Sequence, residues 1–166
     1  ADGGILAGLV EAGLVCAGAS PRDRRPPARP ARDVGLTGDG SPSFGEAFRL
    51  GGALWDLAWR YRGRPFAEVL AFAGRAPPCS AERRAEIVRL AQLFQRAAVW
   101  LPMSRKCLVR SFVLLRFLQR SGLNAQWVIG VRTWPFSAHC WLQLDDMALD
   151  DAWERLVAYE PILAVG

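Results

Sequence analysis

The segment MSRKCLVRSFVLL, residues 103–115, places a cysteine where a helix is expected to begin. Apolar residues at helical spacing follow Cys107, and Arg105 and Lys106 precede it. The first amides of a helix lack intrahelical partners, and the helix dipole favours negative charge at that end. Together with the two basic side chains, they stabilise the thiolate, which is the nucleophilic form of cysteine. The same position also suits a small core residue, so a nucleophile needs partners elsewhere in the chain.

His139 is the single histidine, so a cysteine hydrolase in this chain has one possible imidazole base. It lies in a segment whose alternation predicts a strand, with His139, Trp141 and Gln143 on one face and Cys140 on the other. A histidine inside an apolar strand also suits a structural role with one satisfied hydrogen bond. A cysteine at a helix start and a histidine on the sheet beneath it form the geometry of a thiol hydrolase.

A carboxylate that orients the imidazole would complete a triad, and several aspartates follow His139. The pair at positions 145 and 146 is expected in a turn. Strand register does not decide which of the other two aspartates, Asp150 or Asp151, lies on the face of His139. A two-residue turn puts Asp150 on the face of His139, whereas a three-residue turn puts Asp151 there.

Length and composition predict one globular core, because 51% of the 166 residues are hydrophobic. The net charge of +5 comes almost entirely from arginine and suits an acidic or extended polypeptide partner rather than nucleic acid. No apolar run is long enough to span a bilayer. The four cysteines lack zinc-site spacing, and we expect a reducing, cytoplasmic environment. Because the first residue is Ala1, we expect a fragment or a processed chain.

The order of the predicted elements, helices first and then a small antiparallel sheet, indicates an α+β fold. Helices are expected at residues 4–15, 46–61, 64–73, 80–99 and 107–119, the last one ended by Gly122. Strands are expected at residues 125–133, 137–144 and 147–151, followed by a strand or loop packed on the sheet. The proline-, arginine- and glycine-rich residues 19–43 predict an exposed linker.

Residues 107–151 resemble the core of the lasso-peptide B proteins, which are leader peptidases of the transglutaminase-like, papain-related superfamily. The resemblance covers residues 45–166 and is strongest over residues 100–151. The matching features run in one order: Trp100 and Pro102, the Cys-Leu-x-Arg-Ser opening at Cys107, Gly122, the VIGVR strand, Pro135-Phe136, and the Ala-His-x-Trp stretch.

The resemblance implies a catalytic triad of Cys107, His139 and Asp151. It therefore favours Asp151 over Asp150, a choice that strand register does not make. It implies hydrolysis of one peptide bond between the leader and the core of a ribosomally made lasso precursor, with no metal and no cofactor. The implied partners are this precursor peptide, an ATP-dependent lasso cyclase that closes the ring, and a leader-recognition domain in cis or in trans. Neither nucleic acid nor a membrane is expected as a partner.

The resemblance also implies a domain organisation. Residues 1–17 would be the last helix of a leader-recognition domain, residues 18–44 the linker, and residues 45–166 the peptidase domain. Cys140 departs from the family pattern, which has a small residue there, and we expect its side chain to be inert on the face opposite His139. The Asp-Asp-Met turn also departs from a more typical Asp-Gly.

Two other functions fit the same features. An acyltransferase would use the same three residues but pass the acyl group to an amine rather than to water. A leader-peptide binding module would present the precursor to a partner and perform no chemistry.

Overall fold

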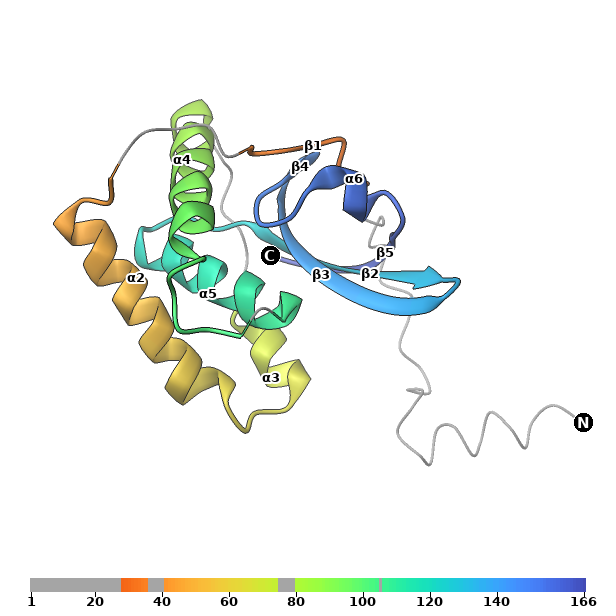
Figure 1. Cartoon of the computed structure of the whole chain (residues 1–166), viewed down its shortest axis with the longest axis horizontal. Coiled ribbons are helices and arrows are strands. Elements are labelled where there is room, and N and C mark those ends of the chain that lie inside the picture. The colour runs from red at the N-terminus through yellow and green to blue at the C-terminus, as the bar shows by residue number, and fades with distance from the viewer. Residues whose placement is uncertain (1–27, 36–40, 75–79, 105) are drawn as a thin grey trace, which may run out of the picture.

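A computed structural model describes residues 28–35, 41–74, 80–104 and 106–166 of the chain. Figure 1 shows helices α2 to α5 on one side of a curved sheet and the short helix α6 on the other. This arrangement of helices and a sheet confirms the predicted α+β class. The helix expected at residues 4–15, most of the expected linker, Cys16 and Cys79 lie outside the described residues.

The first described helix, α2 (Phe44–Asp56), begins with a capping box. The Ser43 side chain accepts from the Glu46 amide, and the Glu46 carboxylate accepts from the Ser43 amide at 2.7 Å. The helix continues into a π-helical turn, η1 (Leu57–Tyr61), which confirms the helix expected at residues 46–61. Its two central glycines cost the helix about 1 kcal/mol each relative to alanine, and tertiary packing outweighs that cost.

Two further helices follow where proline and serine predict them. Helix α3 (Phe66–Ala71) starts directly after Pro65. Helix α4 (Ala81–Ala97) starts after Ser80, whose side chain caps it, and ends two residues before the expected boundary. Helix α4 buries its apolar stripe against the rest of the core.

Helix α5 (Cys107–Arg120) lies at the centre of the fold and is buried on most sides. It ends as predicted at Gly122, whose φ of 73° is easily reached by glycine. The Gly122 amide donates to Gln119 at 3.0 Å and the Leu123 amide donates to Leu118 at 3.0 Å. These two bonds form a Schellman motif, which fixes the C-terminal end of the helix and therefore its direction across the sheet.

The sheet has the strand order β1-β4-β3-β2-β5. The strands are β1 (Arg32–Asp33), β2 (Gln126–Thr133), β3 (Phe136–Leu144), β4 (Met147–Ala148) and β5 (Glu160–Val165). All neighbours pair antiparallel except β1 and β4, which are parallel. The third predicted strand is shorter than expected, because the chain leaves the sheet after Ala148. The C-terminal segment forms both the short helix α6 (Trp153–Leu156) and β5.

The described middle part of the expected linker is exposed at Ala28, Arg29, Ala31 and Arg32, as predicted, but it also joins the sheet. The Ala31 amide donates to Asp146 at 2.8 Å and the Val34 amide donates to Ala148 at 3.1 Å, so β1 extends the edge of the sheet. Val34 is buried, and its carbonyl accepts a hydrogen bond from Gln92 of α4 at 2.7 Å. Local composition cannot predict these contacts, because their partners are distant in sequence.

Each face of the sheet packs on a different set of residues. The face toward α5 joins the main core, to which Cys140 and Leu142 contribute. The other face carries a smaller cluster that includes Trp141 and Tyr159. A Cβ at Gly130 would lie 2.8 Å from the Trp141 ring, so the glycine leaves the space that this indole occupies beside His139.

A buried ion-pair cluster joins α2 to α5. The carboxylate of Asp56 accepts from Arg116 at 3.0 Å and from Arg120 at 3.1 Å. Burial raises the pKa of Asp56, but the hydrogen bonds from Arg120 and Arg116 outweigh it, and the pKa lies below its usual value. The charged form therefore stabilises the fold at neutral pH, and this stability is lost as pH falls through the depressed pKa.

We expect Asp56→Ala to lower the free energy of unfolding by about 3–5 kcal/mol, because it leaves Arg60, Arg116 and Arg120 beside an emptied site. The matched control is Glu68→Ala, which breaks the exposed Arg64–Glu68 pair. That change should cost no more than about 1 kcal/mol. Urea denaturation of both variants measures the difference, and equal losses would contradict the role given to Asp56.

Candidate active site

Cys107 is the first residue of α5, as the sequence predicts for a helix-start cysteine. Among the described residues, no side chain caps this helix and no acidic residue lies in its first turn. The free amides and the helix dipole therefore act on the half-buried Cys107 thiol. This environment favours the thiolate.

His139 and Asp151 lie together beside this helix start. The Nε2 atom of His139 is 2.6 Å from Oδ2 of Asp151. The imidazole is buried and packs on the ring of Tyr159, with 5.3 Å between ring centroids, and on Trp141 at 6.3 Å. One ring nitrogen is thus held by a carboxylate, and the ring plane is fixed by two aromatic neighbours.

The charges of Cys107 and His139 stabilise one another. Hydrogen bonds from the Cys140 thiol and from His139 lower the pKa of Cys107 to about 3, against an opposing effect of burial. Burial lowers the pKa of His139, but its hydrogen bonds with Asp151 and Cys107 outweigh this and raise it to about 9. Between these two values the pair rests as thiolate and imidazolium.

Asp150 has a different environment from Asp151. Its fully buried carboxylate accepts from the Leu142 amide at 2.8 Å and from the Ser111 hydroxyl at 2.6 Å. Burial raises its pKa to about 6, although both hydrogen bonds oppose the change. Ser111 lies one helical turn after Cys107, so Asp150 ties the start of α5 to β3.

The position of Asp151 corrects the reasoning from strand register. Leu144 pairs with Met147, so the turn between β3 and β4 has two residues, which would put Asp150 on the face of His139. The structure instead brings Asp151 to the imidazole. The alternation fails because β4 has only two residues and the chain bends at residues 149–151. This is the aspartate that the family resemblance indicates.

The short β4 also explains how residues from opposite faces of β3 meet. Of the residues of β3, only Gln143 and Leu144 pair with β4, so within the described residues the edge of β3 at His139 has no strand partner on that side. Cys107 reaches this edge from the α5 side, and Asp151 and Tyr159 reach it from the other side. The three residues predicted from the sequence therefore gather at one open strand edge.

The expectation that Cys140 is chemically inert agrees with its raised pKa, but Cys140 also has a contact that the sequence did not predict. Cys140 does lie on the face opposite His139, in the core against α5. Because α5 begins on that face, the Cys140 thiol hydrogen-bonds to Cys107. This contact and burial raise the pKa of Cys140, so it acts as the donor while Cys107 carries the charge. The only sign of this contact in the sequence is the unusual residue after the histidine.

We expect Cys140→Ala to raise the pKa of Cys107 by about 1 to 2, because a hydrogen bond to a charged group contributes about 1.5–3 kcal/mol. The rate of Cys107 alkylation by iodoacetamide as a function of pH measures this value. Ser137→Ala, at the rim of the same pocket, is the control. An unchanged profile for Cys140→Ala would show that its thiol does not support the thiolate.

A pocket of about 490 Å³ contains Cys107, His139 and Asp151. A second pocket of about 380 Å³ lies beside it, with an apolar wall made by Ala98, Val99, Leu101 and Met103. Gln95, Arg110 and Arg155 line both pockets, so the two form one continuous depression. Gln95 and Arg155 carried no signal in the sequence, and Arg110 stood out only as part of the Cys-Leu-x-Arg-Ser opening. The spacing of Arg110, three residues after Cys107, could have placed it on the same helix face.

The described residues contain neither a candidate metal site nor a candidate membrane-spanning helix. No group of three or more histidine, cysteine, aspartate or glutamate side chains is arranged to hold a metal ion. No described helix combines the length and apolar character needed to cross a membrane.

Comparison with known proteins supports the resemblance seen in the sequence. Residues 52–164, about two thirds of the chain, match the family described as transglutaminase-like superfamily. A 46-residue segment, 28% of the chain, is 41% identical to the microcin J25-processing protein McjB of Escherichia coli. That segment covers 22% of the relative, so the chain matches only about a fifth of its length. No solved structure gives a significant match. The resemblance to lasso-peptide B proteins is thereby confirmed.

Proposed function

Because the chain belongs to the transglutaminase-like superfamily, we propose that it is a cysteine peptidase that removes the leader from a lasso precursor peptide. The observation that carries the proposal is one pocket that holds a helix-start cysteine, a histidine and an aspartate hydrogen-bonded to that histidine. The similarity to a microcin-processing protein supports a precursor peptide as the substrate. A partner cyclase would then close the ring on the released core.

In the proposed reaction, the thiolate of Cys107 attacks the carbonyl carbon of the scissile peptide bond. The carbon–nitrogen bond breaks, and the imidazolium of His139 protonates the leaving amine. A water molecule then gives a proton to His139 and attacks the thioester. This step releases the leader with a new carboxylate and restores the thiolate.

Asp151 would act as the positioning partner of His139. Its carboxylate holds Nε2 and directs the other ring nitrogen toward Cys107. It also stabilises the imidazolium that donates the proton. The pKa values of about 3 for Cys107 and about 9 for His139 predict that the active ion pair exists throughout the neutral pH range.

The amide of Cys107 is one donor for the oxyanion that forms during attack, because it belongs to the free first turn of α5. A second donor would come from the segment before Cys107, which lines the depression at Leu101, Met103 and Ser104. An extended peptide would lie along the two joined pockets. Arg110 lines both pockets, so its guanidinium group would donate to a carbonyl of this peptide.

The test is mass spectrometry of a synthetic candidate precursor incubated with the chain in ¹⁸O-enriched water, with and without a separate leader-recognition domain. The proposal predicts two products, a free core and a leader that carries one ¹⁸O atom in its new carboxyl group. A product joined to an added amine would indicate acyl transfer. Binding without any cleavage would indicate a leader-binding module. Either result would overturn the proposed peptidase.

A further inference from the structure

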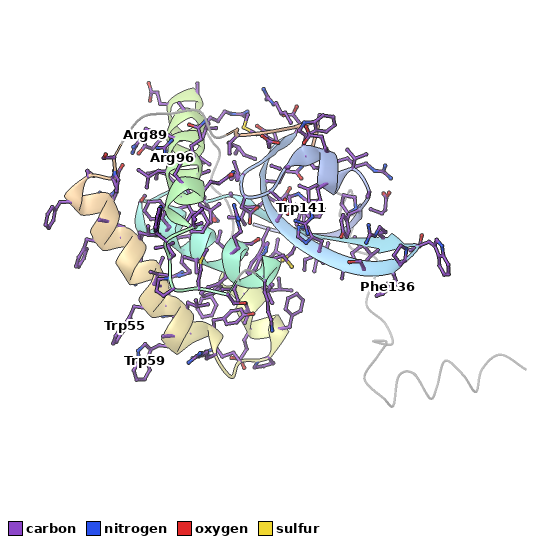
Figure 2. All side chains as sticks on the ribbon, in the orientation of Figure 1. Trp55, Trp59, Arg89, Arg96, Phe136 and Trp141 are labelled. Atoms are coloured by element: carbon purple, nitrogen blue, oxygen red, sulfur yellow. The ribbon has the colours of Figure 1, made fainter. Side chains whose placement is uncertain are left out.

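The outer face of α2 and η1 carries four large aromatic side chains that the described part of the chain leaves in solvent. Phe44, Phe48, Trp55 and Trp59 expose 98, 81, 64 and 67% of their surface, and we call these four residues the aromatic stripe. In Figure 1, α2 runs along the outer left edge of the molecule, and Figure 2 shows Trp55 and Trp59 pointing away from it. A single exposed apolar residue is ordinary, but a contiguous patch indicates an interaction surface.

The spacing of these residues makes the patch continuous. Successive members of the aromatic stripe are four, seven and four positions apart, which places them on one narrow face of a helix. The opposite face of α2 is buried and includes Leu50, Ala53 and Asp56. The Trp55 and Trp59 rings are 5.7 Å apart, so this end of the stripe presents one joined aromatic surface.

Two glycines, Gly51 and Gly52, lie at the centre of α2. Packing within the described part of the chain explains why only one of them must be glycine. A Cβ at Gly52 would lie 2.7 Å from the guanidinium group of Arg120. A Cβ at Gly51 would meet no described atom within 4 Å, although glycine weakens a helix interior relative to alanine. Gly51 lies between the two halves of the aromatic stripe, where a missing side chain permits another backbone to approach closely.

We propose that the aromatic stripe is the interface of a homodimer, in which α2 crosses α2 of a second copy in antiparallel orientation. The midpoint between Phe44 and Trp59 is also the midpoint between Phe48 and Trp55, and it falls between Gly51 and Gly52. A two-fold axis at this point places each phenylalanine opposite a tryptophan of the second copy and brings Gly51 of each copy close to the crossing. This is the self-complementarity that a two-fold interface requires.

Charge and area are both compatible with this pairing. The same symmetry places Arg60 opposite Ser43 and Arg49 opposite Leu54, so no like charges face each other along the crossing. Arg60 also pairs within its own chain with Asp56 at 3.4 Å, a carboxylate that it shares with Arg116 and Arg120. Large aromatic side chains bury about 150–250 Å² each, so four of them supply most of the roughly 800 Å² per partner of a standard interface.

Sedimentation velocity over a range of micromolar concentrations tests the proposal. The wild-type chain should sediment as a species of twice its 18.3 kDa mass, and Trp55→Glu should sediment as a monomer. Trp134→Glu, which changes an exposed tryptophan outside the aromatic stripe, should remain a dimer. A monomeric wild type, or a dimer that survives Trp55→Glu, would overturn the proposal. Binding to anionic lipid vesicles by a monomeric wild type would assign the stripe to a membrane surface instead.

A paired substitution tests the symmetry itself. Phe48→Lys or Trp55→Glu alone should weaken the dimer at least about tenfold, because each removes an aromatic contact at the interface centre. The double variant places a lysine opposite a glutamate at both symmetric positions and should recover part of the affinity. Additive loss in the double variant would contradict the antiparallel pairing. Circular dichroism of each variant verifies that α2 remains folded.

Discussion

Replacement of Cys107 by alanine is expected to lower the rate of precursor cleavage by at least about 10⁴-fold. The variant keeps the pocket but removes the atom that forms the thioester. The fold should be retained, because Cys107 is half-buried at a helix start and α5 is held by its other contacts. Single-turnover cleavage of the precursor, followed by mass spectrometry, gives the rate.

The matched control for this variant is Ser121→Ala, at the opposite end of the same helix. Its hydroxyl donates only to Phe117 within the described residues, so its loss should leave cleavage unchanged. If the Cys107 variant still releases the leader at a comparable rate in a purified mixture, Cys107 is not the nucleophile. The remaining cysteines would then require the same test.

Asp151→Asn and Asp150→Asn are expected to have opposite consequences, although the two residues are adjacent. The first should lower kcat by about 10²–10⁴-fold, because an amide cannot stabilise the imidazolium of His139. Its stability should change little, since the Asp151 side chain is partly exposed. The second should lower the free energy of unfolding by about 1–3 kcal/mol, because the new amide group cannot accept from both the Leu142 amide and Ser111.

Two measurements on both variants separate these roles. Cleavage kinetics report the positioning of His139, and urea denaturation reports the buried network around Asp150. A larger loss of kcat in Asp150→Asn than in Asp151→Asn, at equal folded fraction, would reassign the carboxylate. The pH profile adds a second readout, because the pKa of His139 should fall in Asp151→Asn and move the basic limb of activity to lower pH.

Local patterns in the sequence predicted most of the fold. The apolar run after Cys107 predicted a central helix, Ser80 and Gly122 predicted helix ends, and alternation predicted β2 and β3. These features depend on interactions between residues a few positions apart, so they can be predicted from composition and spacing. The segment at β1 was missed, because a two-residue strand in an arginine- and proline-rich stretch is held by hydrogen bonds to residues more than a hundred positions away.

The site was predictable in its residue types but not in its detailed contacts. One histidine and one helix-start cysteine limited the possible pair. Alternation could not choose between Asp150 and Asp151, because the chain bends immediately after the two residues of β4. The Cys140 contact and the Tyr159 packing depend on how α5 and the C-terminal segment meet the sheet. Such tertiary contacts leave no local period in the sequence.

The most direct test of the resting Cys107–His139 ion pair needs no substrate. Alkylation of each cysteine by iodoacetamide is followed by peptide mass spectrometry between pH 4 and pH 9. With a pKa of about 3, Cys107 should react at nearly its full rate at pH 5, whereas Cys140, with its raised pKa, should stay unreactive. An alkylation rate for Cys107 that rises only near the pKa of an ordinary thiol, about 8.5, would contradict the account.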